Sequence, residues 1–243
     1  MSIVLSLRRA ADAVLSLVFP PHCVVCNVQT STPGFLCGRC EEGVGIINDP
    51  FCQQCSLPFE GEITGDFKCS NCEDRKFHFV TSVSCYRARG VVRDLIHRFK
   101  YGKEYYLRHQ LAEWAAAGLS DERLRIPDFD ALVPVPLHPA RQREREFNQA
   151  EAIAELLSER SGKRVVHALQ RIRYTDSQTR HDRAERIENL RGAFRVRHAD
   201  AVLNRHLVLV DDVFTTGSTV EECARVLTEA GAASVRALVV ARR

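Results

Sequence analysis

The sequence lacks several features that would place it at once in a broad functional class. It has no long uninterrupted apolar segment, because Arg8, Arg9 and Asp12 break up the apolar residues 1–19 and no small-residue cleavage site follows. That stretch is too short and too interrupted for a signal peptide or a membrane span. The net charge of +3 is too small to indicate nucleic acid binding by itself. Aromatic residues, on which nucleobases stack, make up only 7% of the chain.

The N-terminal residues have apolar side chains at helical spacing. Residues 3–18 therefore predict an amphipathic helix, within an N-terminal segment of residues 1–20 that Pro20 and Pro21 end. We expect this helix to pack on its own domain or on a partner chain, with contact to a membrane surface as the alternative. The sequence leaves the oligomeric state open.

Cysteine, in contrast, is abundant. Of the 10 cysteines, eight form four Cys-x-x-Cys pairs, which are Cys23 and Cys26, Cys37 and Cys40, Cys52 and Cys55, and Cys69 and Cys72. Two such pairs form one tetrahedral Cys₄ site, so the eight thiolates predict two structural zinc ions. Sequential pairing would give two tandem ribbons, and interleaved pairing is equally compatible with the spacing. Residues 21–76 are rich in turn residues, so we expect this double zinc ribbon to fold around its metal.

Cysteine usage and charge distribution add three expectations. Zinc thiolate sites suit a reducing cytosol, where disulfides rarely persist, so we expect a cytoplasmic protein. The remaining cysteines, Cys85 and Cys223, are expected to pack as small buried side chains. Residues 1–80 carry six Lys/Arg and nine Asp/Glu, so the positive charge of the chain lies after residue 80 and matches an anionic ligand there.

The stretch Leu207–Thr219 combines an apolar segment with two acids and a polar loop. Leu207–Val210 predict a buried strand that is apolar on both faces, as in a parallel sheet. Asp211 and Asp212 follow where this strand is expected to end. Adjacent carboxylates suit a sugar diol, whose hydroxyls need acceptors, or Mg²⁺, which prefers oxygen ligands.

The loop after these acids contains four hydroxyl side chains and one glycine, namely Thr215, Thr216, Gly217, Ser218 and Thr219. A helix is expected from about Val220, with Ser218 or Thr219 as its cap. Unpaired N–H groups and the helix dipole attract phosphate at a helix start, and Gly217 lets the backbone approach it closely. Because open α/β folds bind ligands at the carboxyl ends of their strands, the stretch predicts a site for a phosphorylated ribose.

Predicted strands and helices alternate from residue 79 onward. Strands are expected over residues 79–86, 131–135, 163–172, 207–210 and 235–241, and helices over 91–100, 104–118, 149–160 and 220–230. This alternation predicts an α/β fold with a mainly parallel sheet and helices on both faces, in a domain of residues 77–243.

A second basic segment joins a predicted strand to a predicted helix. Residues 136–148 carry Arg141, Arg143 and Arg145 between the end of one element and the start of the next. This placement predicts a second anion site, and a solvated charged loop is the alternative.

The acidic stretch resembles the signature for phosphoribosyl pyrophosphate (PRPP) of type I phosphoribosyltransferases, an apolar strand followed by Asp-Asp-x-x-Thr-Thr-Gly-Ser-Thr. The resemblance implies that Asp211 and Asp212 hold the ribose 2′- and 3′-hydroxyls, that Thr215–Thr219 hold the 5′-phosphate, and that Mg²⁺ accompanies PRPP. It also implies a loop that embraces the pyrophosphate over Leu137–Arg145, with the binding residues Leu137, His138, Arg141 and Arg145.

Further motifs resemble the ComF family of competence-related proteins, in which a double zinc ribbon precedes a type I phosphoribosyltransferase-like domain. The resemblance covers nearly the whole chain and rests on residues 133–139, on Phe147-Asn148-Gln149 and on Gly192-Ala193-Phe194. The family pattern Arg-Gly-Phe-Asn-Gln reads here with Glu146 in place of glycine. This change removes easy access to a positive φ and brings an acid beside the expected pyrophosphate.

Residues 174–194 correspond to a region where type I phosphoribosyltransferases have a mobile loop that closes over PRPP. No side chain is recognisable as a general base. The candidates to neutralise the leaving pyrophosphate are Arg145, Arg173, Arg180 and Arg183.

Two hypotheses from different classes follow. The first is an enzyme that binds PRPP with Mg²⁺ and transfers the phosphoribosyl group to an unidentified nitrogen acceptor, with release of pyrophosphate. The second is a non-catalytic adaptor that keeps a PRPP-like pocket. It would handle single-stranded DNA together with competence-machinery proteins in natural transformation, because the ComF resemblance implies an association with DNA uptake.

Overall fold

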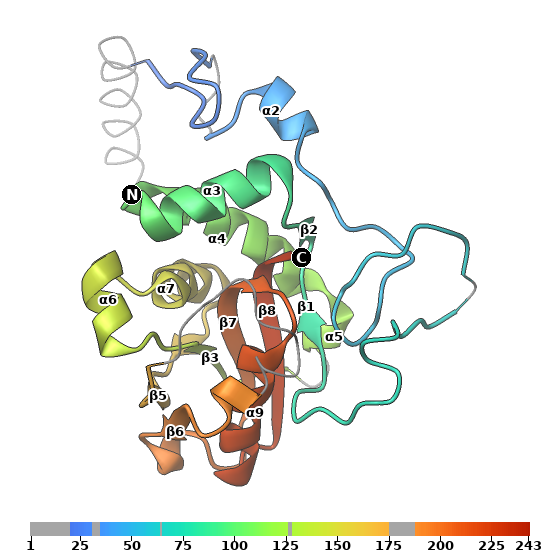
Figure 1. The fold of residues 1–243 in the computed structure, drawn as a ribbon, viewed down its shortest axis with the longest axis vertical. Coiled ribbons are helices and arrows are strands. Elements are labelled where there is room, and N and C mark those ends of the chain that lie inside the picture. Colours follow the sequence, from blue (N-terminus) through green and yellow to red (C-terminus); the bar gives the residue numbers. More distant parts are fainter. Residues whose placement is uncertain (1–19, 31–34, 64, 126–127, 175–187) are drawn as a thin grey trace, which may run out of the picture. The chain divides into compact units, whose positions relative to one another are not determined.

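The structure is a computed structural model that describes residues 20–30, 35–63, 65–125, 128–174 and 188–243 (Figure 1). The N-terminal amphipathic helix expected over residues 3–18 lies outside the described residues, as do Arg180 and Arg183. Within the described part of the chain, no helix has the length and apolar character needed to cross a membrane.

The chain divides into two compact units, Met1–Val44 and Gly45–Arg243. The first unit holds the short helix α2 (Gly38–Glu42) and the first two cysteine pairs. The second unit holds the other two cysteine pairs together with the sheet. The domain limits expected at residues 20 and 76 stay predictions, since the compact units divide the chain inside the expected double zinc ribbon.

A parallel sheet forms the centre of the second unit. Its strands are β1 (Ser82–Val83), β2 (Tyr86–Arg87), β3 (Ala131–Pro134), β4 (Arg164–Val165), β7 (His206–Phe214) and β8 (Ser234–Arg242). The order is β1-β8-β7-β3-β4, with β2 also paired to β8, and every pairing in this sheet is parallel. The two long strands β7 and β8 are largely buried, and each contains an apolar run, residues 207–210 and residues 237–241, as expected for a sheet covered by helices.

Helices pack on this sheet through their apolar residues. The described α-helices of this unit are α3 (Gly90–Tyr101), α4 (Arg108–Ala116), α5 (Glu122–Arg125), α6 (Pro139–Arg145), α7 (Gln149–Ser161) and α9 (Ser218–Glu229). Short 3₁₀ turns complete them at η1 (Tyr105–Leu107), η2 (Ala117–Ser120) and η3 (Ala199–Ala201). α4 and α7 pack on each other and on the sheet, while α9 packs on β7 and β8. The mainly parallel α/β fold expected from the sequence is thus confirmed.

Several predicted elements differ from the structure. The strand expected over residues 79–86 is two short strands, β1 and β2. The strand expected over residues 163–172 divides into β4 and β5 (Leu169–Arg171), because the chain leaves the main sheet there and β5 pairs antiparallel with β6 (Phe194–Val196). Residues 136–148, expected as a loop, contain the helix α6.

The second set of zinc-ligand candidates belongs to the core of its unit. Cys52, Cys55, Cys69 and Cys72 are buried in the same hydrophobic cluster as Leu207, Leu209 and Phe214 of β7. Of the two cysteines outside the Cys-x-x-Cys pairs, Cys223 is fully buried on α9, as expected, whereas Cys85 is only partly buried.

Candidate functional site

β7 carries both acids of the predicted ribose site. It pairs with β8 as far as Phe214, so Asp211 and Asp212 lie inside the strand, and the prediction that the strand ends before them is wrong. Asp212 pairs with Lys100 of α3, with 2.7 Å between Nζ and Oδ1, and Lys100 also acts electrostatically on Asp211, so one ammonium group influences both carboxylates.

Asp211 is electrostatically perturbed. Burial and the charge of neighbouring Asp212 raise the pKa of Asp211 to about 7, even though Lys100 and Arg171 act in the opposite direction. The backbone N–H of Asp212 donates to Oδ1 of Asp211 at 2.9 Å. A carboxyl group that titrates near neutrality at the carboxyl end of a parallel sheet is typical of a functional site.

The loop after β7 turns tightly into α9 at Gly217, which has a φ of +79°. A Cβ atom at this position would lie 2.4 Å from Cζ of Phe214, so both the backbone conformation and the packing require glycine. Gly217 is also the N-cap of α9, and the expected caps Ser218 and Thr219 are instead in the first turn of the helix. Thr216 and Ser218 share a hydroxyl–hydroxyl hydrogen bond of 2.8 Å.

Arg242, at the end of β8, supports this loop from one side. Its Nη1 donates to the carbonyl oxygens of Phe214 at 3.2 Å and Thr215 at 2.9 Å, and its guanidinium lies 5.0 Å from the centre of the Phe214 ring. The loop carbonyls are thereby held by β8. Since the first N–H groups of a helix have no intrahelical acceptor, the start of α9 offers donors to an anion at this loop.

α6 occupies the predicted pyrophosphate loop. The prediction of a loop is wrong because His138 and Pro139 start a helix: Nδ1 of His138 accepts a hydrogen bond from the N–H of Ala140 at 3.2 Å, and proline suits the first helical turn. α6 ends at Glu146, which adopts a φ of +70°. The glycine of the family pattern would fit this conformation. Glu146 adopts it despite its Cβ, and its carboxylate pairs with Lys103.

The basic side chains of α6 contact aromatic rings. Arg145 donates from Nη1 to Oε1 of Gln149 at 2.9 Å and lies 5.1 Å from the ring centre of Tyr101. Arg141 lies 5.5 Å from the ring centre of Tyr174, which also contacts the His138 ring at 5.3 Å. His138 and Arg141 therefore lie beside Tyr174, and Arg145 lies beside Tyr101.

A cavity of about 270 Å³ lies between the start of α6 and the strand β5. Leu137 lines it together with Gln142, Asn148, Gln170 and Arg171. Burial and the positive charge of Arg141 lower the pKa of Arg171, Arg145 acts in the same direction, and Asp211 opposes them. The mutual influence of Arg171 on β5 with Arg141 and Arg145 on α6 gives this region positive charge, which favours an anion.

Sequence reasoning missed Arg171 and Lys100 as site residues. Arg171 lies inside a segment predicted as a strand, and Lys100 lies at the end of a predicted helix, so neither carries a local signal. Both reach the acids of β7 only through the tertiary fold. Arg173, a predicted candidate, donates instead from Nη1 to the carbonyl oxygen of Arg191 at 2.8 Å.

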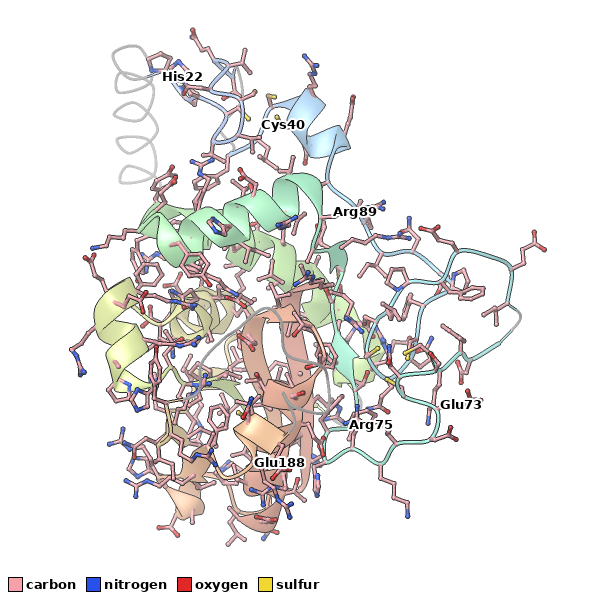
Figure 2. All side chains as sticks on the ribbon, viewed as in Figure 1. His22, Cys40, Glu73, Arg75, Arg89 and Glu188 are labelled. Atoms are coloured by element: carbon pink, nitrogen blue, oxygen red, sulfur yellow. The ribbon has the colours of Figure 1, made fainter. Side chains whose placement is uncertain are left out.

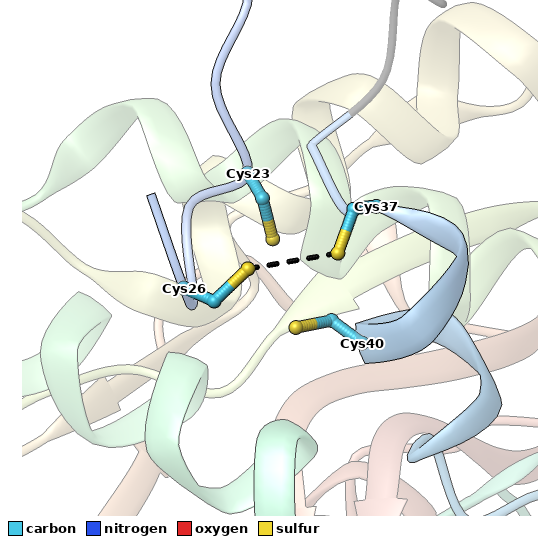
Figure 3. Close-up of side chains that lie close together, drawn as sticks. All are labelled: Cys23, Cys26, Cys37 and Cys40. Carbon is cyan, nitrogen blue, oxygen red and sulfur yellow. Dashed lines mark hydrogen bonds between the residues drawn. The ribbon is translucent and has the colours of Figure 1, made fainter. Parts of the chain in front are cut away.

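The first cysteine cluster joins the first two Cys-x-x-Cys pairs. Figure 3 shows Cys23, Cys26, Cys37 and Cys40 pointing toward one centre, with 3.6 Å between the sulfurs of Cys26 and Cys37. The four sulfurs lie within 4.8 Å of one another. A tetrahedral zinc site with Zn–S bonds of about 2.3 Å has sulfurs roughly 3.8 Å apart, so these thiols fit zinc.

The second cluster joins Cys52, Cys55, Cys69 and Cys72 in the same way, and all four side chains are buried. The sequential pairing of the four motifs is therefore the one found, and the interleaved alternative is wrong. Arg75, in the segment that follows the last cysteine pair (Figure 2), lies 4.7 Å from the ring centre of Phe77. Arg242 Nη2 contacts the sulfur of Cys55 at 3.7 Å, so the second cluster and the loop after β7 share one arginine.

The sheet and its carboxyl-end site define the class of a phosphoribosyltransferase-like domain that follows a zinc ribbon. The family model described as a double zinc ribbon domain matches residues 14–74, and the one described as a phosphoribosyl transferase domain matches residues 141–243. The solved structure of glutamine phosphoribosylpyrophosphate amidotransferase from B. subtilis is similar at 19% identity and a TM-score of 0.41, over 59% of this chain and 30% of that one.

Two whole-length relatives identify the family. The DNA utilization protein YhgH of Salmonella typhi is 30% identical over 228 residues, which cover 90% of this chain and 96% of the relative. Competence protein F of Haemophilus influenzae is 27% identical over 86% of this chain and 97% of the relative. The chain belongs to the ComF family, as its motifs indicate.

Proposed function

We propose that this protein binds PRPP with Mg²⁺ and transfers its phosphoribosyl group to a nitrogen acceptor, releasing pyrophosphate. The observation that carries the proposal is the pair Asp211 and Asp212 on β7, followed at once by the glycine turn into α9. The carboxylates can accept hydrogen bonds from a ribose diol, and the loop that follows them in the chain can donate hydrogen bonds to a phosphate.

The proposal divides the site into two parts. Asp211 and Asp212 accept hydrogen bonds from the ribose hydroxyls, and residues 215–219 donate to the 5′-phosphate. Arg171 of β5, with Arg141 and Arg145 of α6, would hold the pyrophosphate. Carboxylate oxygens of the acids also suit Mg²⁺, which when bound supplies positive charge to the pyrophosphate oxygens.

Positioning and charge would account for the rate enhancement. The acids on the rigid strand β7 orient the ribose, which lowers the entropic cost of reaching the transition state. As the bond from the ribose anomeric carbon to pyrophosphate breaks, negative charge grows on the leaving group, and the nearby guanidinium groups stabilise it. Tyr101 and Tyr174 hold two of these arginines in place through ring contacts.

The test is titration of PRPP and Mg²⁺ by calorimetry, combined with detection of pyrophosphate release in the presence of nucleobases and amines. Each hydrogen bond to a charged group contributes about 1.5–3 kcal/mol, so Asp211→Asn with Asp212→Asn should weaken PRPP binding at least about 100-fold. Asp200→Asn, an exposed acid on η3, is the control and should bind as the parent does. Equal binding by the double variant and the parent would disprove the assignment.

A second candidate function is single-stranded nucleic acid binding, and one relative is named a DNA utilization protein. Three exposed tyrosines, Tyr101, Tyr105 and Tyr106, follow one another at the end of α3 and in η1. Arg145 lies near the ring of Tyr101, and Arg108 lies 4.3 Å from the ring centre of Tyr105. Proteins that bind single strands use exposed aromatic rings beside guanidinium groups. Although aromatic residues are few in this chain, these three are clustered and exposed.

Fluorescence anisotropy with a labelled oligothymidine tests this second candidate. Replacing the three tyrosines by serine should weaken binding about tenfold or more, since stacking contributes about 1–3 kcal/mol per base. Phe59→Ser, at another exposed aromatic, is the control. Binding that is insensitive both to salt and to the tyrosines would exclude this candidate.

A further inference from the structure

Arg242 is the last residue of β8 and is only 5% exposed, although its side chain carries a full positive charge. Its Nη1 donates to the carbonyl oxygens of Phe214 and Thr215 in the loop after β7, and also contacts the carbonyl oxygen of Arg243. Its Nη2 lies 3.7 Å from the sulfur of Cys55 in the second cluster. One planar guanidinium group therefore joins the second cluster to the loop.

We propose that Arg242 couples zinc in the second cluster to the loop after β7, so that bound zinc strengthens PRPP binding and bound PRPP strengthens zinc binding. The inference rests on the proposed function. Arg242 is a positioning residue, because it acts on the 5′-phosphate through the backbone of the loop. Coupling between two binding sites is reciprocal, so it can be measured at either one.

The charge of the second cluster explains why zinc matters to Arg242. A Zn²⁺ ion with four cysteine thiolates is a group of net negative charge. Carbonyl oxygens carry only partial charge, so the zinc site is the stronger partner for a buried guanidinium group. In return, a donor that contacts a metal ligand orients it, and loss of such a donor typically costs about 10–100-fold in metal affinity.

The segment that carries Cys55 is fixed to the sheet. Oγ1 of Thr81 donates to the carbonyl oxygen of Gln53 at 2.7 Å, and Oγ of Ser56 donates to the carbonyl oxygen of Ser82 at 2.8 Å. These bonds join the segment to the start of β1, and β1 pairs with β8. The sulfur and the guanidinium group therefore belong to one frame, and a change at the metal reaches the guanidinium group directly.

A second contact reaches the same loop from the side of the second cluster. Phe79 is buried in the same hydrophobic cluster as the four cysteines, and its ring meets that of Phe214 edge to face at 6.0 Å between centres. The guanidinium group of Arg242 lies 5.0 Å from the centre of the Phe214 ring. This ring packs against Gly217, so a shift of Phe214 changes the turn that presents the N–H donors of α9.

Arg242→Gln tests the coupling, because glutamine lacks both the charge and the fork of donors that reaches two sides at once. Arg236→Gln is the matched control. Arg236 is also a buried arginine of β8, at 2% exposure, but it is paired with Val208 in the register. At about 3.3 Å per residue it lies roughly 20 Å from Arg242.

The variants are made in the full chain carrying Cys23→Ser and Cys26→Ser, so that the second cluster is the one that binds zinc. Zinc affinity is measured by competition with a zinc-selective chelator, with and without PRPP and Mg²⁺, and PRPP affinity by calorimetry. We expect PRPP to raise the zinc affinity of this parent about tenfold, within the range of about 5–150-fold for coupled sites.

Arg242→Gln should bind zinc about 10–100-fold more weakly without PRPP, and PRPP should no longer raise its zinc affinity. Its PRPP affinity should fall about tenfold. Arg236→Gln should keep the tenfold rise in zinc affinity, whatever its stability. If Arg242→Gln does not fold, Arg242→Lys replaces it and should also lose the rise, since one ammonium group cannot bridge the sulfur and two carbonyl oxygens.

The possible failures are distinguishable. If PRPP raises zinc affinity equally in the parent and in Arg242→Gln, or not at all in a parent that binds PRPP, the coupling through Arg242 is wrong. A rise that is lost in Arg236→Gln as well overturns the assignment to Arg242. If the parent does not bind PRPP, the proposed function fails, and zinc affinity without PRPP still decides the role of Arg242 at the cluster: equal affinity in the parent and Arg242→Gln refutes it, and weaker binding by Arg242→Gln alone supports it.

Discussion

Two segments of the site, one after β7 and one after β3, each contain a residue with left-handed backbone conformation at the end of a helix. The first residue precedes α9, and the second follows α6. After β7 this residue is Gly217, which packs against the ring of Phe214. Arg242 donates a hydrogen bond to the carbonyl oxygen of Phe214. After β3 it is Glu146, an exposed residue at the end of α6 that pairs with Lys103. The proposed phosphate side of the site is thus built into the core, whereas the proposed pyrophosphate side lies on a short surface helix. We expect the phosphate side to tolerate far less change.

Loss of the second cysteine cluster should have the largest effect. Cys52→Ser with Cys55→Ser removes ligands from a cluster in the core beside the phosphate loop, and structural zinc contributes about 10 kcal/mol or more to folding. We expect a variant that melts far below the parent and does not bind PRPP. Cys23→Ser with Cys26→Ser, in the other compact unit, should lose one zinc ion and keep PRPP binding. Metal analysis and calorimetry measure both, and equal effects of the two pairs would refute the comparison.

Gly217→Ala should have the next largest effect. The left-handed conformation costs a residue with a Cβ about 1–2 kcal/mol, and the clash with Phe214 adds to this cost. PRPP affinity should fall by about tenfold or more. The control is Gly162→Ala, which has a φ of +68° but no atom within 4 Å of the added Cβ, and should lose stability without losing PRPP affinity. A Gly217→Ala variant with the affinity of the parent would show that the loop is not rigid.

The pH dependence separates Asp211 from the rest of the site. Its pKa is raised from 3.8 to about 7, so the carboxyl is neutral in the folded protein below that pH. PRPP binding that requires the carboxylate should weaken about tenfold per pH unit below 7. Folding responds with the opposite sign: a raised pKa of an acid makes stability fall as pH rises from about 4 to 7.

Asp211→Asn removes this titration and should melt higher than the parent at pH 8, while binding PRPP poorly. Calorimetry and thermal melting between pH 5 and 8 measure both trends. If the affinity of the parent for PRPP is flat over this range, Asp211 does not contact the ligand as a carboxylate.

The smallest effect is expected at the surface of the pyrophosphate side. Glu146→Gly relieves the left-handed conformation and loses an exposed ion pair, for a net gain of about 0.5–1 kcal/mol in stability. Glu146→Ala loses the same pair and keeps the backbone cost, so it should not stabilise the protein. Thermal melting distinguishes them. Equal melting temperatures for the two variants would mean that the backbone at Glu146 carries no cost.

Local sequence patterns predicted the elements whose cause is local. The apolar run 207–210, the acids after it and the turn at Gly217 each follow from neighbouring residues, and so do the helices α3, α7 and α9. The sequential pairing of the cysteine motifs and the contact of Arg242 with Cys55 depend on the fold of the whole unit. A spacing of two residues between cysteines indicates only that each pair can bind one metal ion. It does not indicate which two pairs share that ion.

The extension of β7 past the acids was not predictable from the residues themselves. Aspartate is depleted in strands, so Asp211 and Asp212 indicate that the strand ends before them. Their pairing with β8 outweighs that preference, because Asp211 is opposite Val239 and Val213 opposite Ala241 in the register. α6 was missed for the related reason that its polar residues give no apolar periodicity, although His138 and Pro139 were a recognisable start.

The ion pair between Lys100 and Asp212 has a kinetic consequence. An ammonium group tethered 2.7 Å from a carboxylate acts as a counter-ion that does not diffuse away, so a free metal ion that approaches Asp212 must compete with it. A metal ion that is already chelated by the phosphates of a ligand meets less competition, because the ligand brings new anionic partners for the ammonium group as well. Under the proposed function, this geometry favours an order of addition in which Mg²⁺ and PRPP bind together.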